Sequence, residues 1–323
     1  MGSAGAVIED DERHLPSLFV ETERARKYAG QAKADNTRRA YRADWADFAA
    51  WCALRRVSAL PATPQTVALY LSGLAEHRKV STLQRRLSAI SQAHKTAGHP
   101  TPTKDAAVRA VFAGIRRAHG TAQQGKAPVM TPDLRQMVAA LPNSPLGMRD
   151  RALLLVGFAG AFRRSELVGL DVADVSFTRD GLVIRLRRSK TDQDGQGRTI
   201  GVPYGSRPLT CPVRALQDWL KLSRITTGAI FRPFDRHGNI QSERFSDRGV
   251  ARVVQRAALA AGLDPADFAG HSLRAGLATS AAAAGISERA IMAQTGHKSL
   301  PMVRRYIRDG SLFNDNAAAG IGL

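Results

Sequence analysis

The chain has 323 residues, 44% of them hydrophobic, and a formal net charge of +19. This length is enough for about two domains, each with its own core. Cys52 and Cys211 are too few and too far apart for a disulfide framework or a cysteine metal site. The longest apolar run, residues 152–162, is shorter than the roughly 20 residues that cross a bilayer. We therefore expect a globular cytoplasmic protein with no membrane span and no signal peptide.

The positive charge is concentrated in two regions of the chain. Residues 1–35 carry a net charge of −2, residues 36–125 of +10 and residues 126–323 of +11. A polyanion held from two sides explains this distribution, and duplex nucleic acid is the commonest polyanion. A basic solvated surface without a partner is the alternative. It is less favoured because the charge is spread through helical segments and does not lie in a tail.

The first 120 residues predict helices only. Residues 1–35 show weak periodicity and are expected to be a partly ordered N-terminal segment. From Asn36, the expected N-cap, the spacing of Tyr41, Trp45 and Phe48 is typical of an amphipathic helix. Three more helices are expected over 63–77, 80–98 and 105–120, which makes residues 36–120 a small all-helical domain. Its helices are expected to display Arg38, Arg39, Arg42, Arg85, Arg86 and Lys95.

Residues 121–129 have the composition of a linker and, fully extended, span roughly 30 Å. The second domain, residues 130–323, is expected to be mainly α-helical with a small β-sheet or hairpin. Its first helix is expected to have Thr131 as N-cap. Alternation of Leu182, Ile184 and Leu186, answered by Ile200 and Val202, predicts a β-hairpin. Lys190 would then lie where its first strand meets the loop.

Two short motifs in the C-terminal part of the chain are candidates for a functional site. His271 and Arg274 lie at i and i+3 near an expected helix start, where two donors and the helix amides suit a phosphate. Taken alone this pair is weak evidence, and a surface ion pair explains it too. Tyr306 falls at the edge of the apolar stripe of a helix expected from Leu300, with Ser299 as N-cap. It could face a cleft there, although a half-buried structural tyrosine would fit the pattern equally.

The whole ordered set is more specific than either motif. The chain has Arg163 and Glu166 in "GAFRRSEL", the hairpin lysine, "HSLR", His297 in "GH", and a tyrosine nine residues later. In this order it resembles the tyrosine recombinase (phage integrase) family, most closely its Cre-like members. The resemblance covers residues 130–310 and, more loosely, the helical domain, which it identifies as a SAM-like core-binding domain. It implies the catalytic set Arg163, Glu166, Lys190, His271, Arg274, His297 and Tyr306, with Tyr306 as the nucleophile. Glu166 also suits a helix N-terminus as an ordinary acidic residue.

The resemblance implies a site-specific DNA recombinase that forms a 3′-phosphotyrosyl intermediate and exchanges strands through a Holliday junction. Fixed guanidiniums can stabilise the charge that develops on the phosphate, and a protein nucleophile preserves the bond energy, so neither metal nor ATP nor another cofactor is expected. The expected partners are double-stranded DNA with inverted-repeat sites and three further copies, joined through residues 312–323 in a homotetramer. A nucleoid-associated prokaryotic, phage or mobile-element protein fits this activity. A type IB topoisomerase-like enzyme and a non-catalytic DNA-binding regulator are the alternatives.

The resemblance also suggests where DNA is contacted. Arg248 matches a helix that enters the major groove, where it would contact either a guanine or a phosphate. The six basic side chains of the helical domain are expected to contact the DNA backbone, which positions the protein without specifying sequence.

Overall fold

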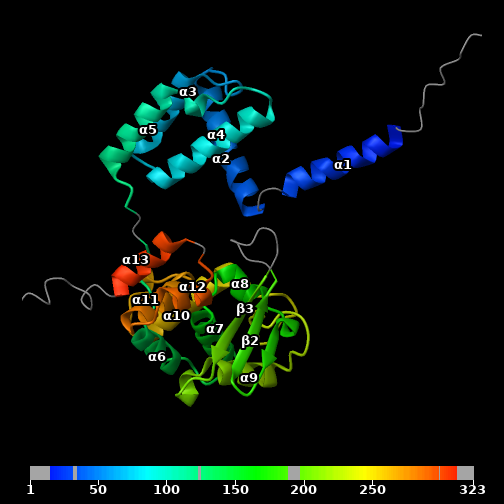
Figure 1. The fold of residues 1–323 in the computed structure, drawn as a ribbon, viewed down its shortest axis with the longest axis vertical. Helices are drawn as coiled ribbons and strands as arrows, with labels where there is room; N and C mark the ends of the chain where they lie inside the picture. The colour runs from blue at the N-terminus through cyan, green and yellow to red at the C-terminus, as the bar shows by residue number, and fades with distance from the viewer. Residues whose placement is uncertain (1–14, 32–34, 123–124, 188–196, 298, 311–323) are drawn as a thin grey trace, which may run out of the picture. The chain divides into compact units, whose positions relative to one another are not determined.

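The computed structural model describes residues 15–31, 35–122, 125–187, 197–297 and 299–310. The chain divides into two units, Met1–Gln123 (unit 1) and Gln124–Leu323 (unit 2), each with its own core (Figure 1). In the described ranges no helix is both long and apolar enough to cross a membrane.

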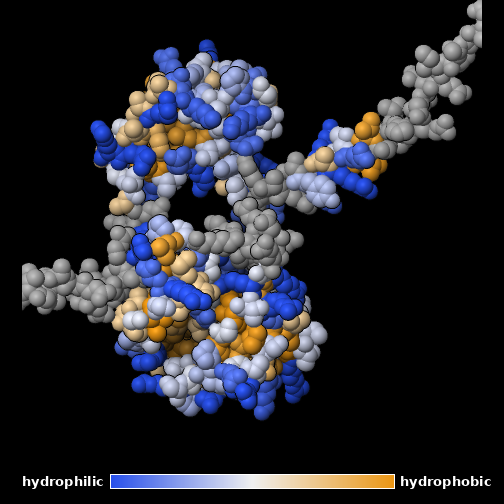
Figure 2. Space-filling view, in the orientation of Figure 1, coloured by the Kyte–Doolittle hydropathy of each residue, from blue (hydrophilic) through white to orange (hydrophobic). Residues whose placement is uncertain are grey.

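Unit 1 consists of helices in its described part. These are α1 (Leu15–Gln31), α2 (Asp35–Leu54), α3 (Pro64–Ala75), α4 (Val80–Thr96), the short 3-10 helix η2 (Pro102–Lys104) and α5 (Ala106–His119). The weak periodicity of the first 35 residues did not predict α1, because its apolar side chains are exposed, and hydrophobic surface is visible on this helix (Figure 2). Phe19 and Tyr28 each have 69% of their surface accessible. Asn36 is not an N-cap, since α2 already begins at Asp35.

The core of unit 1 forms where α2 packs against α4 and α3 packs against α5. Phe48 of α2 and Tyr70 of α3 meet there edge to face, with ring centroids 5.0 Å apart. His94, fully buried on α4, accepts a hydrogen bond from the Ala62 amide at Nε2 and donates from Nδ1 to the Ile90 carbonyl. One neutral histidine therefore ties α4 to the loop that precedes α3.

Unit 2 contains all the residues that the sequence predicts to be catalytic. Its helices are α6 (Thr131–Ala139), α7 (Pro145–Ala159), α8 (Arg164–Gly169), η3 (Val172–Asp174), η4 (Pro208–Thr210), α9 (Pro212–Ser223), α10 (Asp247–Ala260), η5 (Pro265–Asp267), α11 (Ser272–Ala283), α12 (Glu288–Thr295) and α13 (Leu300–Gly310). Thr131 is not the N-cap of α6, because Met130 holds that position and Pro132 lies in the first turn. Helix α7 is buried along its middle; the sheet lies to one side of it and α10 and α11 lie to the other (Figure 1).

The sheet of unit 2 is antiparallel with the order β1-β2-β3. Its strands are β1 (Val175–Phe177), β2 (Gly181–Leu186) and β3 (Arg198–Pro203). The predicted hairpin is confirmed: Leu182 pairs with Val202 and Ile184 with Ile200, all four buried. The pattern did not predict β1, which has three residues and no buried side chain. Lys190, placed at the end of the first strand, lies outside the described residues.

Close backbone approach fixes α11 under the chain that enters unit 2. Gly276 lies so near the Val129 carbonyl that a Cβ atom would stand 1.9 Å from its oxygen. The Val129 amide in turn donates to the Ser272 carbonyl over 3.0 Å. On its other side α11 packs against α12 and α13, where Val303 is fully buried. Helix α11 therefore links the start of unit 2 to the helix that carries Tyr306.

Candidate active site

A carboxylate and a guanidinium are paired at the start of α8. Glu166 accepts a hydrogen bond from the Arg163 backbone amide over 2.9 Å and from Arg163 Nη1 over 2.5 Å. The Glu166 side chain is 2% exposed and that of Arg163 15%. Arg164 instead approaches Asp247, at 3.9 Å. Of the two adjacent arginines, Arg163 is therefore the one held by the buried acid.

Arg274 is almost completely buried on α11, with 1% of its surface exposed. Its Nη1 donates to the Ala161 carbonyl over 2.7 Å, and its Nη2 has no hydrogen-bond partner among the described residues. Burial and the nearby charge of Arg163 lower the pKa of Arg274 to about 10, so it stays charged at pH 7. A buried cation with a bare donor is costly unless an anion completes it. Arg274 is thus ready to bind an anion.

His297 follows the C-terminal end of α12 and is 7% exposed. Thr295 Oγ1 donates to the Ile291 carbonyl over 2.7 Å, so it can only accept from His297 Nδ1, 2.8 Å away. Hydrogen on Nδ1 leaves Nε2 as the free ring nitrogen. Burial, followed by the charges of Arg274 and Arg163, lowers the pKa of His297 to about 4. His297 is therefore neutral at pH 7.

Tyr306 of α13 is half-buried, at the edge of a small apolar cluster with Val303 and Ile291. Its ring stacks on that of His297 with centroids 5.7 Å apart and planes inclined by 29°. The predicted position at the edge of the apolar stripe is therefore confirmed. His271 holds the N-cap position of α11 and is exposed.

Arg198, which the sequence analysis missed, belongs to the same cluster of charged side chains as Arg163, Glu166 and Arg274. It begins β3, and its Nη1 donates to the Gln294 carbonyl over 3.0 Å while its Nη2 lies 3.9 Å from Glu166 Oε2. Residues 198, 200 and 202 share one face of β3, and the latter two are buried. A charged residue on the core face of a strand was the signal that could have revealed it.

The charges of this cluster do not balance. Arg163, Arg198 and Arg274 are cationic, and His297 is neutral. Among the described residues, Glu166 is the single carboxylate of the cluster, and it pairs with Arg163 and Arg198. The net charge is about +2. An anion with one negative charge, such as a phosphodiester, would lower it to about +1 and supply acceptors for the unpaired donors.

The comparisons with known proteins show the family of the chain. Residues 129–311 match the model of the phage integrase family. An integrase/recombinase xerD homolog of Selenomonas ruminantium is 45% identical over 298 residues, which cover 91% of this chain and 87% of that protein. The chain belongs to the phage integrase family. It is a tyrosine recombinase, an enzyme of DNA breaking and rejoining.

Two other recombinases are less similar to this chain. The recombinase cre of Escherichia phage P1 is 28% identical over 283 residues, covering 81% of this chain and 80% of that one. A lambda integrase dimer bound to a COC′ core site superposes with a TM-score of 0.60 at 20% identity, covering 91% of this chain and 77% of that chain. This last likeness supports the fold: mostly helical, with a small antiparallel sheet.

Unit 1 of this integrase family member does not display all the basic side chains expected of it. Arg86 is 6% exposed and binds Asp47 through two hydrogen bonds of 2.6 and 2.8 Å. Its guanidinium lowers the pKa of Asp47. Arg85 grips the buried Asp44 over 2.7 and 3.0 Å, although half of its own side chain is exposed. The expected display of Arg86 is wrong, because an amphipathic pattern cannot show that acids on α2 face it.

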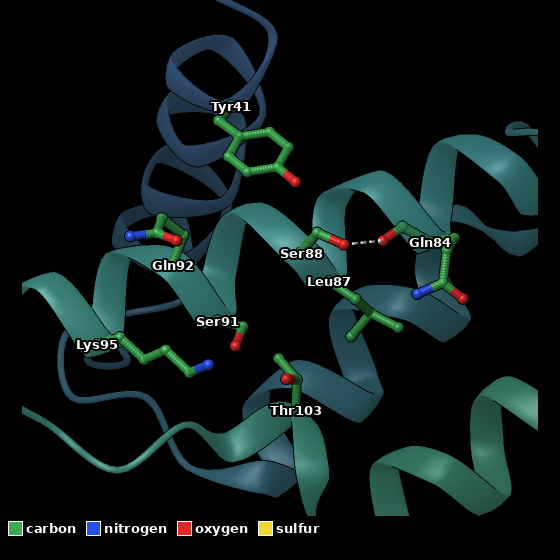
Figure 3. A pocket seen from close by; sticks show the side chains of 8 residues that line it. All are labelled: Tyr41, Gln84, Leu87, Ser88, Ser91, Gln92, Lys95 and Thr103. Atoms are coloured by element: carbon green, nitrogen blue, oxygen red, sulfur yellow. Dashed lines mark hydrogen bonds between the residues drawn. The ribbon is translucent and has the colours of Figure 1, made fainter. Parts of the chain in front are cut away.

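Unit 1 also has a hollow of about 290 Å³ between α2, α4 and η2 (Figure 3). Its lining residues are Tyr41, Gln84, Leu87, Ser88, Ser91, Gln92, Lys95 and Thr103. Five of these, from Gln84 to Lys95, are polar residues spaced along one face of α4. Sequence reasoning singled out only Lys95 because it searched for charge. Arg38, Arg39 and Arg42 of α2 and Arg248 in the first turn of α10 are exposed.

Proposed function

We propose that this enzyme is a site-specific recombinase that cleaves DNA with Tyr306 and holds the strand as a 3′-phosphotyrosyl intermediate. The observation that carries the proposal is the ring of Tyr306 stacked on buried, neutral His297, beside a cluster of net positive charge that includes the bare Nη2 of Arg274. A nucleophile next to unpaired cationic donors suits attack on a phosphodiester.

The chemistry follows from the cluster. Attack by the Tyr306 oxygen on phosphorus builds negative charge on the non-bridging oxygens, which Arg163 and Arg274 can stabilise without reorganising. The bond to the 5′ oxygen breaks, and that oxygen needs a proton, for which Lys190 is the proposed donor. Exposed His271 is the proposed acceptor of the tyrosine proton. Repeating the exchange with a partner strand would pass through a Holliday junction, without ATP because the phosphotyrosyl bond retains the energy of the broken one.

His297 has a distinct role in this scheme. Its Nδ1 hydrogen is engaged by Thr295, so it can donate to a phosphate only after Nε2 takes up a proton. A bound phosphodiester offsets the guanidinium charges that lower the pKa of His297, and so favours that uptake. Binding of the scissile phosphate would therefore promote protonation of His297, which adds a hydrogen-bond donor to those of Arg163 and Arg274.

The decisive experiment is covalent trapping. DNA recovered from the purified protein would be sequenced, and a nicked suicide substrate built on the enriched site. The wild type should form an adduct that survives denaturing electrophoresis, Tyr306→Phe should form none, and the matched control Tyr28→Phe, with an exposed ring on α1, should react normally. An adduct that persists in Tyr306→Phe would refute the assignment. Relaxation of supercoiled plasmid without any enriched site would favour the topoisomerase alternative.

We propose that α4 and the first turn of α10 contact the DNA. Glutamine can pair with adenine through two hydrogen bonds and arginine with guanine, whereas Arg38, Arg39, Arg42 and Lys95 suit phosphates. Gln84→Ala or Arg248→Ala should then relax sequence preference, while Arg39→Ala should weaken binding to all sequences and flatten its salt dependence. An unchanged site preference in both of the first two variants would argue against base reading there.

We also propose that the enzyme works as a DNA-bound homotetramer in which residues 312–323 of one copy dock on the next. The support is an apolar cavity of about 410 Å³ in unit 2, whose lining includes Phe158, Val202, Leu277, Ile286, Ile291 and Gln294. The tail supplies apolar side chains at residues 312, 313, 321 and 323. Deleting residues 312–323, or substituting Leu277→Glu, should abolish pairing of two sites in a gel shift while single-site binding persists. Retained pairing in both would refute the docking.

A further inference from the structure

The guanidinium of Arg198 joins three parts of unit 2 that are distant in sequence. From the start of β3 it reaches the buried carboxylate of Glu166 on α8, at 3.9 Å, and the last carbonyls of α12. Its Nη1 lies 3.0 Å from the Gln294 carbonyl and 3.4 Å from that of Ala293. The carbonyls at a helix C-terminus have no partner within the helix and carry partial negative charge, so a buried cation stabilises them.

The contact continues to Gly296, the residue before His297. Gly296 has φ of +67°, and a Cβ atom built there would stand 2.7 Å from Arg198 Nη1. Arg198 therefore packs directly on the turn that sets the direction of His297. A second hydrogen bond also holds this helix end to β3, since Gln294 Nε2 donates to the Gly201 carbonyl over 3.2 Å.

We propose that Arg198 is a positioning residue that holds His297, and through the ring stack Tyr306, in register with Arg163 and Glu166. Arg163 is hydrogen-bonded to Glu166, and His297 is stacked on Tyr306. The Arg198 side chain lies against Glu166 of the first pair and against the end of α12, which leads into His297 of the second. This inference rests on the proposed cleavage by Tyr306 for its kinetic test, but not for its structural test.

The structural test uses the free protein. Histidine ring signals are followed by NMR from pH 8 to pH 4, with the signal of His297 identified by its loss in His297→Ala. In Arg198→Gln the pKa of His297 should rise, because the charges acting on it from Arg274, Arg163 and His271 remain while that of Arg198 is removed. The ring-current shift of the stack with Tyr306 should also diminish. Arg185→Gln, which removes an exposed charge from β2 of the same sheet, should change neither.

The kinetic test is a double-mutant cycle on single-turnover cleavage at saturating DNA. Arg198→Gln should slow cleavage by about tenfold to a hundredfold with little change in DNA affinity, because a misplaced group costs rate and not binding. In a His297→Ala background the same substitution should have much less effect, since Arg198 would then have little left to position. An undiminished effect in that background would overturn the proposal and indicate direct contact of Arg198 with the phosphate.

Arg198→Lys separates charge from position, and also serves if Arg198→Gln does not fold. Lysine keeps the charge but cannot reach both carbonyls and Glu166 at once. The pKa of His297 should stay close to the wild-type value while cleavage still slows at least several-fold. Wild-type cleavage by Arg198→Lys together with an unchanged ring stack in Arg198→Gln would refute the positioning role. Failure of the wild type to cleave would count against the proposed function alone, because the NMR test needs no DNA.

Discussion

Replacing Glu166 by glutamine should destabilise unit 2 more than any exposed substitution. The change keeps the shape and an oxygen that can accept from the Arg163 amide, but it removes the carboxylate that pairs with Arg163 and Arg198 in the described part of the site. The net charge of the cluster rises from about +2 to about +3.

The magnitude follows from the distances. At an effective dielectric constant of about 20, a charge pair at 3.9 Å contributes about 4 kcal/mol and one at 2.5 Å about 7 kcal/mol, before the carboxylate's desolvation is subtracted. Breaking a buried pair by removing one partner typically costs about 3–5 kcal/mol. We expect a loss in that range for Glu166→Gln.

Urea unfolding followed by tryptophan fluorescence measures this loss. Trp219, fully buried, is the single tryptophan of unit 2, so the double substitution Trp45→Phe and Trp51→Phe isolates its signal. With a slope of about 2–3 kcal/mol per molar urea, the midpoint should fall by roughly 1–2 M. Sulfate should restore more stability to the variant than to the wild type, because it supplies the missing negative charge.

A matched control defines the refutation. Glu288 forms an exposed ion pair with Arg304 at 3.3 Å, and Glu288→Gln should change the stability of unit 2 by less than about 1 kcal/mol. If Glu166→Gln is as mild as Glu288→Gln, the charge argument for the site is wrong.

Three further predictions concern stability. The folded site lowers the pKa of His297 to about 4 from an unfolded value near 6.5, so the unfolded chain binds the proton more readily. The free energy of unfolding should therefore be unaffected by this group above pH 6.5 and fall by about 3 kcal/mol as the pH is lowered through 4. His297→Gln should flatten this pH dependence in the same urea assay. Gly276→Ala should destabilise unit 2 by at least about 1–3 kcal/mol in thermal unfolding, because its Cβ would meet a carbonyl oxygen. Gly114→Ala on α5, with open space around it, should instead stabilise unit 1 by about 0.5–1 kcal/mol. Arg86→Met should cost unit 1 about 1–3 kcal/mol, because buried Arg86 loses its hydrogen bonds while the Asp47 left behind stays partly exposed to water. Exposed Arg39→Met should cost less than about 0.5 kcal/mol; both are followed through the two tryptophans of that unit, and equal effects would contradict a structural role of the Arg86–Asp47 pair.

Local sequence patterns predicted elements that bury one face, but not contacts between residues distant in sequence. Alternation predicted the hairpin because its two strands bury one face, and helix spacing placed Tyr306 at the edge of its stripe. Arg198 was missed because its partners, Glu166 and the end of α12, are distant in sequence, and no local pattern encodes such contacts. Arg86 was misplaced for the same reason. The exposed apolar side chains of α1 left no periodic signal, since that helix has no buried face in its described part.

The acids of unit 1 have a consequence for engineering tighter DNA binding. The region 36–125 contains four carboxylates, and each has a structural partner: Asp44 binds Arg85, Asp47 binds Arg86, Glu76 approaches His119 and Asp105 caps α5. Neutralising an acid is the usual way to raise the affinity of a protein for a polyanion. Here the two acids that pair with α4 cannot be neutralised without loosening the crossing of α2 and α4. At these two positions the proposed DNA affinity can therefore be raised only by adding cations nearby.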